Sequence, residues 1–254
     1  MAEKDIAEKL LEDYNDVFAD IVNVLLFGGK NIIRKDDLEK TERISHYKAD
    51  DGKLHEQERD IAKYWKRNGT RIALCGLENQ TGIDKDMCLR IINYDGAAYR
   101  SQLLDSASKE RYPVITIILY FGFCHWSGPK ALHNTLNIPE ELIEYTNDYK
   151  IHVFEIAYLT DEQVSQFSSD FRIIADYFVQ MRKGKNYQPS RQIIKHVDEL
   201  LKFMAVITND DRFAEASSKV KKEELPCAKY SIELNSKVLK KVTQNVLCRV
   251  LKVQ

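Results

Sequence analysis

Residues 60–78 read Asp60-Ile-Ala-Lys-Tyr-Trp-Lys-Arg67-Asn68-Gly69-Thr70-Arg-Ile-Ala-Leu-Cys-Gly-Leu-Glu78, which is two β-compatible runs around an Asn-Gly pair. Asn-Gly between two runs of β-compatible residues is a strong short-range signal for a β-hairpin. The sequence therefore predicts two antiparallel strands that meet at this turn, with Asp60 at the start of the first strand and Glu78 at the end of the second.

On either side of the hairpin, the spacing of apolar residues predicts an alternation of helices and strands. We expect helices over 3–27, 85–104, 139–146, 161–183 and 189–207, and strands over 112–121 and 149–158. Residues 34–57 are strongly polar, which indicates a loop or a short irregular element. This order of elements predicts an α/β or α+β core followed by a helical C-terminal region.

Composition excludes several classes of protein. The 254 residues include 44% hydrophobic and 30% charged side chains, a globular balance, and the formal net charge of -1 argues against a protein that coats nucleic acid by bulk charge. The five cysteines contain no Cys-x-x-Cys pair, so neither a disulfide framework nor a zinc ribbon is indicated. The N-terminus has no apolar signal core, and the longest apolar run is too short for a bilayer. We expect a soluble cytoplasmic protein with no membrane contact.

The loop of the hairpin decides whether Asp60 and Glu78 share a face of the sheet. With a plain two-residue loop, Asp60 lies opposite Leu77 and Glu78 points to the other side. With a three-residue loop or a bulged strand, Asp60 lies opposite Glu78, and two carboxylates on facing positions would suit a hard cation such as Mg²⁺. Spacing alone also fits two solvated acids at strand ends. A metal site requires the bulged or odd-length hairpin.

The block Gly76-Leu77-Glu78-Asn79-Gln80, continued by Asp84-x-Asp86-Met87-x-Leu89-Arg90 and Tyr94-Asp95, resembles the Rpn family of recombination-promoting nucleases and YhgA-like transposases. That family is placed in the PD-(D/E)XK nuclease superfamily. The resemblance covers roughly residues 10 to 215, and four further segments share it: Asn15-Asp16-x-Phe18, Tyr112-Pro113-Val114 through Leu119-Tyr120-Phe121-Gly122, Trp126-x-Gly128-Pro129 and Asn147-Asp148-Tyr149-Lys150-Ile151.

The resemblance implies a restriction-endonuclease-like core, with a mixed central sheet flanked by helices, and a DNA endonuclease that hydrolyses phosphodiester bonds in recombination or element mobility. It implies Mg²⁺ or Mn²⁺ held by Asp60, Glu78 and the backbone carbonyl of Asn79, and DNA as partner. Gln80 stands where many relatives have Lys; because its amide does not titrate, it would orient water by hydrogen bonding. The alternative is a catalytically inactive nucleic-acid-binding or interaction module that retains the fold.

Other residues are candidates for supporting roles, each with a structural alternative. Asp16, the first-helix acid, would contact the metal through water as in similar nucleases, or it is a helix-face acid paired with solvent or a nearby base. Arg90 and Tyr94 share a helix face and would bind phosphate or brace Glu78; a structural Arg–acid pair is the alternative. The hairpin's basic residues would meet the DNA backbone or form a solvated face: Lys63, Lys66, Arg67 and Arg71.

The domain organisation implied by the resemblance is a nuclease-like core over 1–160, a helical region over 161–225 and an atypical tail over 226–254. Relatives usually continue with a charged helix that begins near Met-Cys-Glu, whereas the tail from Pro226 does not match. One choice of codons for this tail gives a family-like sequence in a shifted frame. We hypothesise a frameshift at or just before Pro226, which the gene's nucleotide sequence would decide. Homo-oligomer formation is left open.

Overall fold

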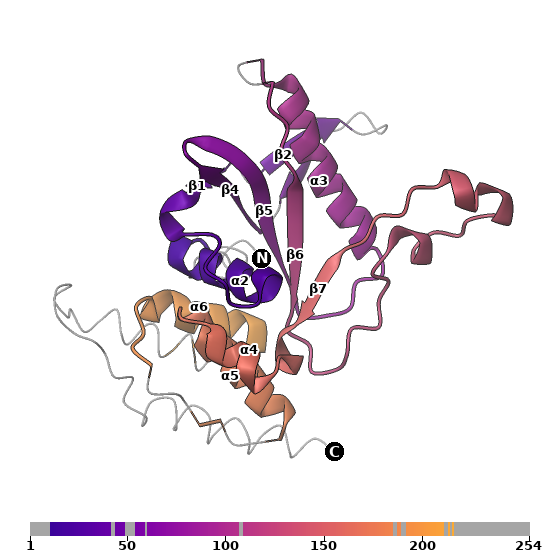
Figure 1. Cartoon of the computed structure of the whole chain (residues 1–254). Helices are drawn as coiled ribbons and strands as arrows, with labels where there is room; N and C mark the ends of the chain where they lie inside the picture. Colours follow the sequence, from indigo (N-terminus) through magenta and orange to yellow (C-terminus); the bar gives the residue numbers. More distant parts are fainter. Residues whose placement is uncertain are drawn as a thin grey trace. The chain divides into compact units, whose positions relative to one another are not determined.

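The computed structural model contains the hairpin expected from the sequence, formed by β4 (Ile61–Arg67) and β5 (Thr70–Gln80) (Figure 1). The two turn residues between the strands both have positive φ angles, 51° and 82°, as a type I′ turn requires. The strands are out of step by one residue near the turn, because Trp65 pairs with Ala73 whereas Lys66 pairs with Arg71. Ile72 is therefore an extra, bulged residue in β5. The expectation of a bulged or odd-length hairpin is confirmed.

The hairpin lies within a mixed five-stranded sheet of order β1-β4-β5-β6-β7. The antiparallel part of the sheet consists of β1 (Leu38–Lys40) paired with β4, and of β4 paired with β5. The parallel part adds β6 (Val114–Tyr120) and β7 (His152–Glu155). The predicted α/β class with a mixed sheet is confirmed, and the arrangement is consistent with a restriction-endonuclease-like core.

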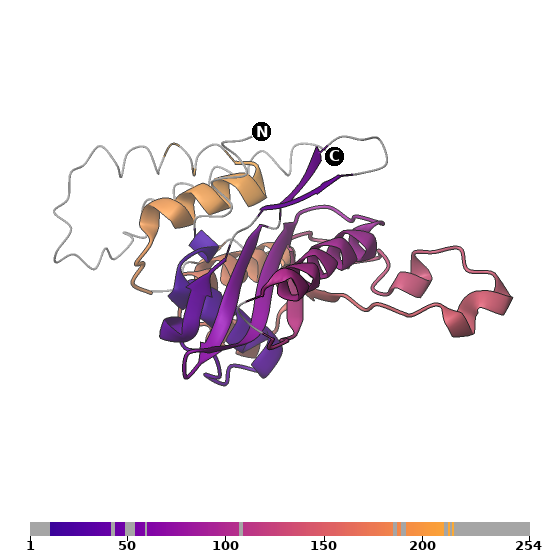
Figure 2. The same cartoon turned by 90° about the horizontal axis from the view of Figure 1, so that it is seen from above.

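Helix α3 (Met87–Leu104) covers one face of this sheet (Figure 2). The packing involves even-numbered strand residues: Ala62, Leu74 and Val114 form one buried cluster next to Ala98 of α3. A second cluster joins the helix to the carboxyl-terminal half of β6 and consists of Met87, Cys88, Ile91, Ile118, Tyr120, Trp126 and Ile151. Side chains alternate along a strand, so the even-numbered positions of β5 that follow the bulge, including 78 and 80, face α3.

The structure describes residues 11–41, 44–48, 54–58, 60–106, 109–184, 187–188, 192–210, 213 and 215. They belong to two compact units, one of residues 36–155 and one of residues 1–35 with 156–254. The sheet and α3 belong to the first unit. The second unit contains the remaining long helices, in which α5 contacts α2 and α4: α2 (Asn15–Phe27), α4 (Asp161–Gln166), α5 (Phe171–Arg182) and α6 (Val197–Thr208). None of the described helices is long and apolar enough to cross a bilayer.

The expectation of a loop over residues 34–57 is wrong. This segment contains the 3₁₀ helix η1 (Lys35–Asp37), the edge strand β1, and a separate antiparallel pair, β2 (Ile44–Lys48) with β3 (Leu54–Glu58). The polar composition of the segment did not indicate these strands. Strand β1 pairs with β4, and β2 pairs with β3, and such pairing does not require an apolar face on every strand.

The later elements were predicted with the right type but the wrong lengths. The strand expected over 149–158 is shorter, because the 3₁₀ helix η4 (Ile156–Tyr158) follows β7 directly. The helix expected over 161–183 is divided into α4 and α5, and the one expected over 189–207 gives α6. The short helix expected over 139–146 is the 3₁₀ helix η3 (Glu140–Tyr145), with Pro139 preceding it. The described part of the helix expected over 3–27 gives α2, which ends at Gly28.

The turn makes one stability prediction. A Cβ added at Gly69 would meet no heavy atom within 4 Å, so only its φ of +82° opposes a side chain. Gly69→Ala is expected to lower the free energy of unfolding by about 1 kcal/mol, the cost of a left-handed conformation for an L-residue. Gly82→Ala is the matched control, because that site is equally open and has no positive φ. Urea denaturation should show Gly82→Ala within about 0.5 kcal/mol of the parent chain; equal losses in both variants would contradict the explanation.

Candidate active site

The bulge at Ile72 brings Asp60 into line with Glu78. Ile61 pairs with Leu77, so the next step along the same register is Asp60 opposite Glu78. Asp60 also shares the face of Ala62, two residues on, which packs beneath α3. The backbone N–H of Asn79 donates to Oδ2 of Asp60 at 2.8 Å, which fixes that carboxylate against the end of β5. Both acids therefore lie on the α3 face at the carboxyl-terminal end of β5.

Glu78 is a buried acid, with only 2% of its surface exposed. Gln80 lies two residues further on the same face, and its Nε2 donates to Oε1 of Glu78 at 3.4 Å. A buried carboxylate is costly unless charged or polar groups surround it, and the Gln80 amide is one such polar group beside Glu78.

Arg90, one turn into α3, connects Glu78 to the loop before the helix. Its guanidinium forms ion pairs with Glu78 and, at 2.9 Å, with Oδ2 of Asp84. Burial acts to lower the pKa of Arg90, but its hydrogen bond to Tyr94, the charge of Glu78 and its hydrogen bond to Asp84 outweigh burial and raise the pKa. Arg90 is therefore a permanent cation, and its ion pair with Glu78 fits both the bracing of Glu78 and the structural Arg–acid pair that the sequence left open. Asp84 was not among the expected site residues.

Tyr94, one turn further along α3, accepts a hydrogen bond from Arg90 at 3.4 Å. Its pKa is raised, first by burial, then by the negative charge of Glu78 and also by that of Asp60. The phenol therefore keeps its proton at neutral pH and is within electrostatic reach of both acids. As a neutral hydroxyl it can donate to a phosphate oxygen.

Asp16 belongs to the other unit, where it contacts bases as its structural alternative expected. His196 Nε2 lies 3.3 Å from Oδ1 of Asp16, and Lys195 Nζ lies 3.7 Å from Oδ2. Tyr14 stacks on the ring of His196 at 3.7 Å between centroids. These contacts link α2 to the start of α6. The water-mediated role of Asp16 at a metal stays a prediction.

Glu155, which the sequence did not single out, lies at the same edge of the sheet. Gln80 pairs with Tyr120, and Tyr120 pairs with Glu155, so the three form a row across the parallel strands. His125 Nδ1 lies 2.8 Å from Oε2 of Glu155, and Lys130 Nζ lies 3.5 Å from Oε1. Burial acts to raise the pKa of Glu155, but the bonds from His125, from the backbone of Trp126 and from Lys130 lower it overall.

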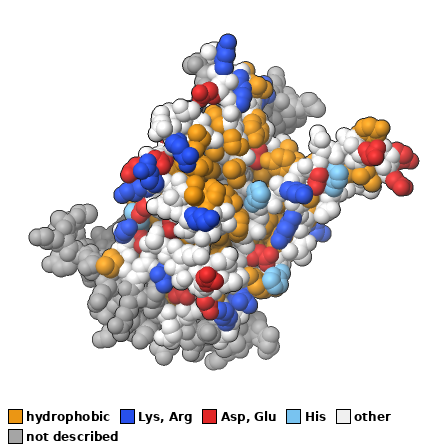
Figure 3. Space-filling model, viewed as in Figure 1, with side chains coloured by type: hydrophobic (Ala, Val, Ile, Leu, Met, Phe, Trp, Pro, Cys, Tyr) orange, Lys and Arg blue, Asp and Glu red, His pale blue; other side chains and the backbone are white. Residues whose placement is uncertain are grey.

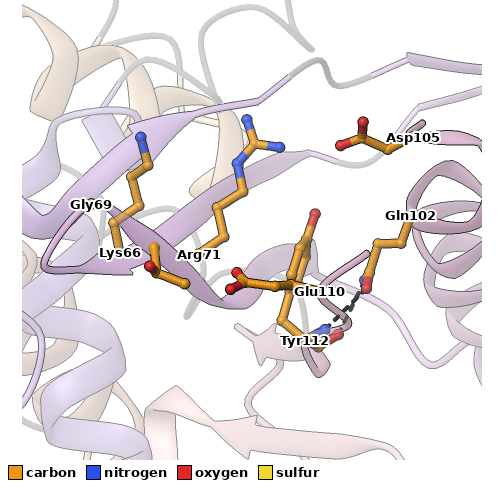
Figure 4. Close-up of a pocket in the computed structure, with 8 residues that line it drawn as sticks. Lys66, Gly69, Arg71, Gln102, Asp105, Glu110 and Tyr112 are labelled. Atoms are coloured by element: carbon orange, nitrogen blue, oxygen red, sulfur yellow. Dashed lines mark hydrogen bonds between the residues drawn. The ribbon is translucent and has the colours of Figure 1, made fainter. Parts of the chain in front are cut away.

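The basic residues of the hairpin do not form one exposed row. Lys63 is fully buried. Lys66 and Arg71 both pair with Glu39 of β1, and Arg71 also stacks over the ring of Tyr64 at 3.8 Å. Lys66 and Arg71 line a cavity of about 330 Å³ at the turn end of β5, across from the end of α3 (Figure 4). Buried Lys63 fits neither of the two alternatives that the sequence left open for these residues, contact with the DNA backbone or a solvated hairpin face.

The donor set at the end of β5 fits a hard divalent cation by its chemistry. Mg²⁺ in proteins is usually held by one or two carboxylates and keeps several waters. Asp60 and Glu78 supply two carboxylates, and oxygens of Asn79 and Gln80 are adjacent in the chain. Within the part of the chain that the structure describes, no group of three or more His, Cys, Asp and Glu residues could hold a metal.

Comparison with known proteins gives one match. The model of the family described as "Putative transposase, YhgA-like" matches residues 66–208, more than half of the chain. This description associates the chain with mobile-element function. No curated protein and no solved structure matches the chain. The matched range includes Glu78, Gln80, Arg90 and Tyr94. On the extent of this match, the chain belongs to the YhgA-like transposase family.

Proposed function

We propose that the protein is a divalent-metal-dependent DNA endonuclease that hydrolyses phosphodiester bonds in recombination or element mobility. The observation that carries the proposal is the bulge at Ile72, which aligns Asp60 with Glu78 on one face of the sheet. Two like charges so arranged repel each other unless cations lie near them. Arg90 offsets Glu78 from one side, and a metal ion would offset both acids from the other. Membership in a transposase family supports DNA as the substrate.

Each residue of the candidate site has its own role in the proposed cleavage. Asp60, Glu78 and the backbone carbonyl of Asn79 would hold Mg²⁺ or Mn²⁺, and the ion, when bound, would polarise a water and offset charge on the phosphate. Gln80 would orient the attacking water through its amide. Arg90 holds the Glu78 carboxylate in place, and Tyr94 keeps a neutral hydroxyl beside it. These roles support the assignment of the site to the PD-(D/E)XK class of nucleases.

A second candidate is a DNA-binding module that retains the fold without cleaving. Two observations favour it: Gln80 cannot take a proton from water, and Arg90 already pairs with Glu78. The two candidates differ in one measurable respect, because only the endonuclease changes the covalent structure of bound DNA.

The endonuclease is tested by incubating purified full-length protein with supercoiled plasmid. We expect nicked or linear products with Mg²⁺ or Mn²⁺ and none with EDTA. With Ca²⁺ we expect binding and little cleavage, because Ca²⁺ is larger and activates its water less. Cleavage that persists in EDTA would reject the metal mechanism. A mobility shift without cleavage under any ion would select the binding module.

Gln80 makes a separate prediction. Gln80→Ala is expected to lower the cleavage rate about 10- to 100-fold, the scale of one lost positioning contact. Gln80→Glu is the companion variant, because it keeps the shape of the side chain but adds a third negative charge next to Glu78. The added charge should tighten Mg²⁺ binding and should also change the rate of cleavage. Isothermal titration with Mg²⁺ and single-turnover cleavage separate the two effects. A loss in Gln80→Ala as large as that in a variant of Asp60 would instead make Gln80 a metal ligand.

A further inference from the structure

The most exposed large apolar side chains of the described residues gather at two places. Tyr145, 81% exposed, lies in the segment between β6 and β7, and Leu103 and Leu104, 71% and 74% exposed, lie at the end of α3. Both places belong to the unit of residues 36–155. Concentrated apolar exposure on a folded protein usually marks an interaction surface.

The first place is a projecting segment of residues 131–150, here called the arm. Its two limbs are bonded to each other: Leu132 N–H donates to the Tyr149 carbonyl at 2.9 Å, and His133 N–H donates to Asp148 Oδ1 at 3.1 Å. Both views show the arm extending away from the sheet and from the end of α3 (Figures 1 and 2). Because the arm is held by bonds of its own, its exposed apolar residues are presented in a defined geometry.

The tip of the arm, residues 136–146, is apolar and acidic at once. It includes η3 and contains no Lys or Arg. Figure 3 shows hydrophobic and acidic side chains together at this tip. The exposed apolar members are Leu136, Leu142, Ile143 and Tyr145, and the exposed acids are Glu140, Glu141 and Glu144. A matching surface must therefore be apolar with basic residues at its rim.

The outer face of the end of α3 has this character. Gly96, Arg100, Leu103 and Leu104 are exposed; Arg100 lies four residues after Gly96, and the adjacent leucines lie three and four residues after Arg100, so the four form one stripe along the helix. Exposed Lys109 follows the helix. The nearby acids Asp105 and Glu110 line the cavity on the hairpin side, as Figure 4 shows, rather than the stripe. The stripe thus ends in two exposed leucines, with Arg100 within it and Lys109 beside it.

Other occupants for the tip fit less well. The arm extends away from the end of α3 in its own chain. Two tips in contact would bring six glutamates together, and DNA carries the same sign of charge as the tip. We propose that the protein forms a two-fold symmetric dimer in which the arm tip of each copy docks on the α3 stripe of the other copy. Two-fold symmetry makes each contact twice, which closes the assembly.

The oligomeric state of the full chain tests this dimer. Sedimentation velocity across a concentration series should show a reversible dimer with a dissociation constant in the micromolar range or below. Replacing the apolar anchors, as Leu103→Ser with Leu104→Ser or as Tyr145→Ser, should weaken dimerisation about 100-fold. Ile193→Ser is the matched control, since Ile193 is 55% exposed in the other unit, and it should leave the dimer unchanged. A monomer at every concentration, or a dimer indifferent to these changes, overturns the proposal.

Charge reversal and cross-linking test which surfaces meet. Arg100→Glu alone, and Glu140→Lys with Glu141→Lys and Glu144→Lys, should each weaken the dimer about 10-fold, and their combination should restore it. In a mixture of differently tagged copies, one with Tyr145→Cys and one with Leu104→Cys, a disulfide should join unlike copies under mild oxidation. Parent chains provide the background for Cys124, which is exposed. No restoration and no cross-link above that background would show that the tip and the stripe do not meet.

Discussion

Replacing Asp60 or Glu78 by its neutral amide is expected to lower the rate of plasmid cleavage at least about 1000-fold, equivalent to about 4 kcal/mol of lost transition-state stabilisation. Each change removes one of two carboxylates that the bulge at Ile72 aligns. Asp60→Asn keeps an oxygen that can accept from the Asn79 N–H, so the strand end should remain in place. The loss should therefore be chemical rather than structural, and thermal melting would check that each variant is folded.

A control variant and a DNA-binding measurement show whether the loss of cleavage arises at the proposed site. Glu162→Gln, an exposed acid of α4 in the other unit, removes the same charge far from the proposed chemistry in sequence and should cleave like the parent chain. DNA affinity of Asp60→Asn and Glu78→Gln, measured in EDTA, should be equal to or greater than that of the parent, because a charge that repels phosphate is gone. Full cleavage by both amide variants would mean that the activity arises elsewhere and that the central proposal is wrong.

The hairpin shows how much of this site the sequence could predict. Asn68-Gly69 fixed the turn, and the requirement that Asp60 and Glu78 share a face led to the expectation of a bulge. The position of the bulge was not predictable, since nothing in the local sequence distinguishes Ile72 from its apolar neighbours. It depends on how β4, β5 and their turn twist together in three dimensions.

The missed elements depend on contacts between distant residues. Strand β1 has three residues and is held by pairing with β4 and by ion pairs to Glu39 from Lys66 of β4 and Arg71 of β5. The break between α4 and α5 coincides with Ser168 and Ser169, whose N–H groups donate to the carboxylate of Asp20 on α2. A helical apolar pattern continues through such a break, because the pattern records burial and not the partner of each backbone N–H.

The network around Glu78 was predicted in part. The shared helix face of Arg90 and Tyr94 was evident from spacing, and bracing of Glu78 was one of two readings. Asp84 was overlooked because it lies six residues before Arg90, on a loop whose course spacing does not define. The contact between Asp16 and His196 joins residues 180 positions apart, and no periodicity could indicate it. The domain division at residue 160 and the frameshifted tail stay predictions; residues from 216 onward lie outside the described part of the chain.

Arg90 carries the second large prediction, which concerns stability. Arg90→Met keeps the length of the side chain but leaves the buried carboxylate of Glu78 without its guanidinium. Removing one partner of a buried ion pair is strongly destabilising; because Arg90 is itself 39% exposed, we expect the free energy of unfolding to fall by about 2 kcal/mol. Arg111→Met, an exposed cation in the same unit, is the control and should change stability by no more than about 0.5 kcal/mol.

The pH dependence of that loss identifies its cause. In Arg90→Met, the buried Glu78 carboxylate loses the favourable charge of the guanidinium, so its folded-state pKa should be higher than in the parent chain, and protonation of Glu78 should favour the folded variant. The deficit should therefore be small at acidic pH and grow as pH rises through the folded-state pKa. Adding Glu78→Gln to Arg90→Met removes the titrating group, so the double variant should recover at least about half of the loss and lose its extra pH dependence. Urea denaturation from pH 5 to pH 8 measures both effects. A deficit independent of pH, or a double variant whose losses simply add, would mean that Arg90 stabilises the chain through packing and does not hold the Glu78 carboxylate in place.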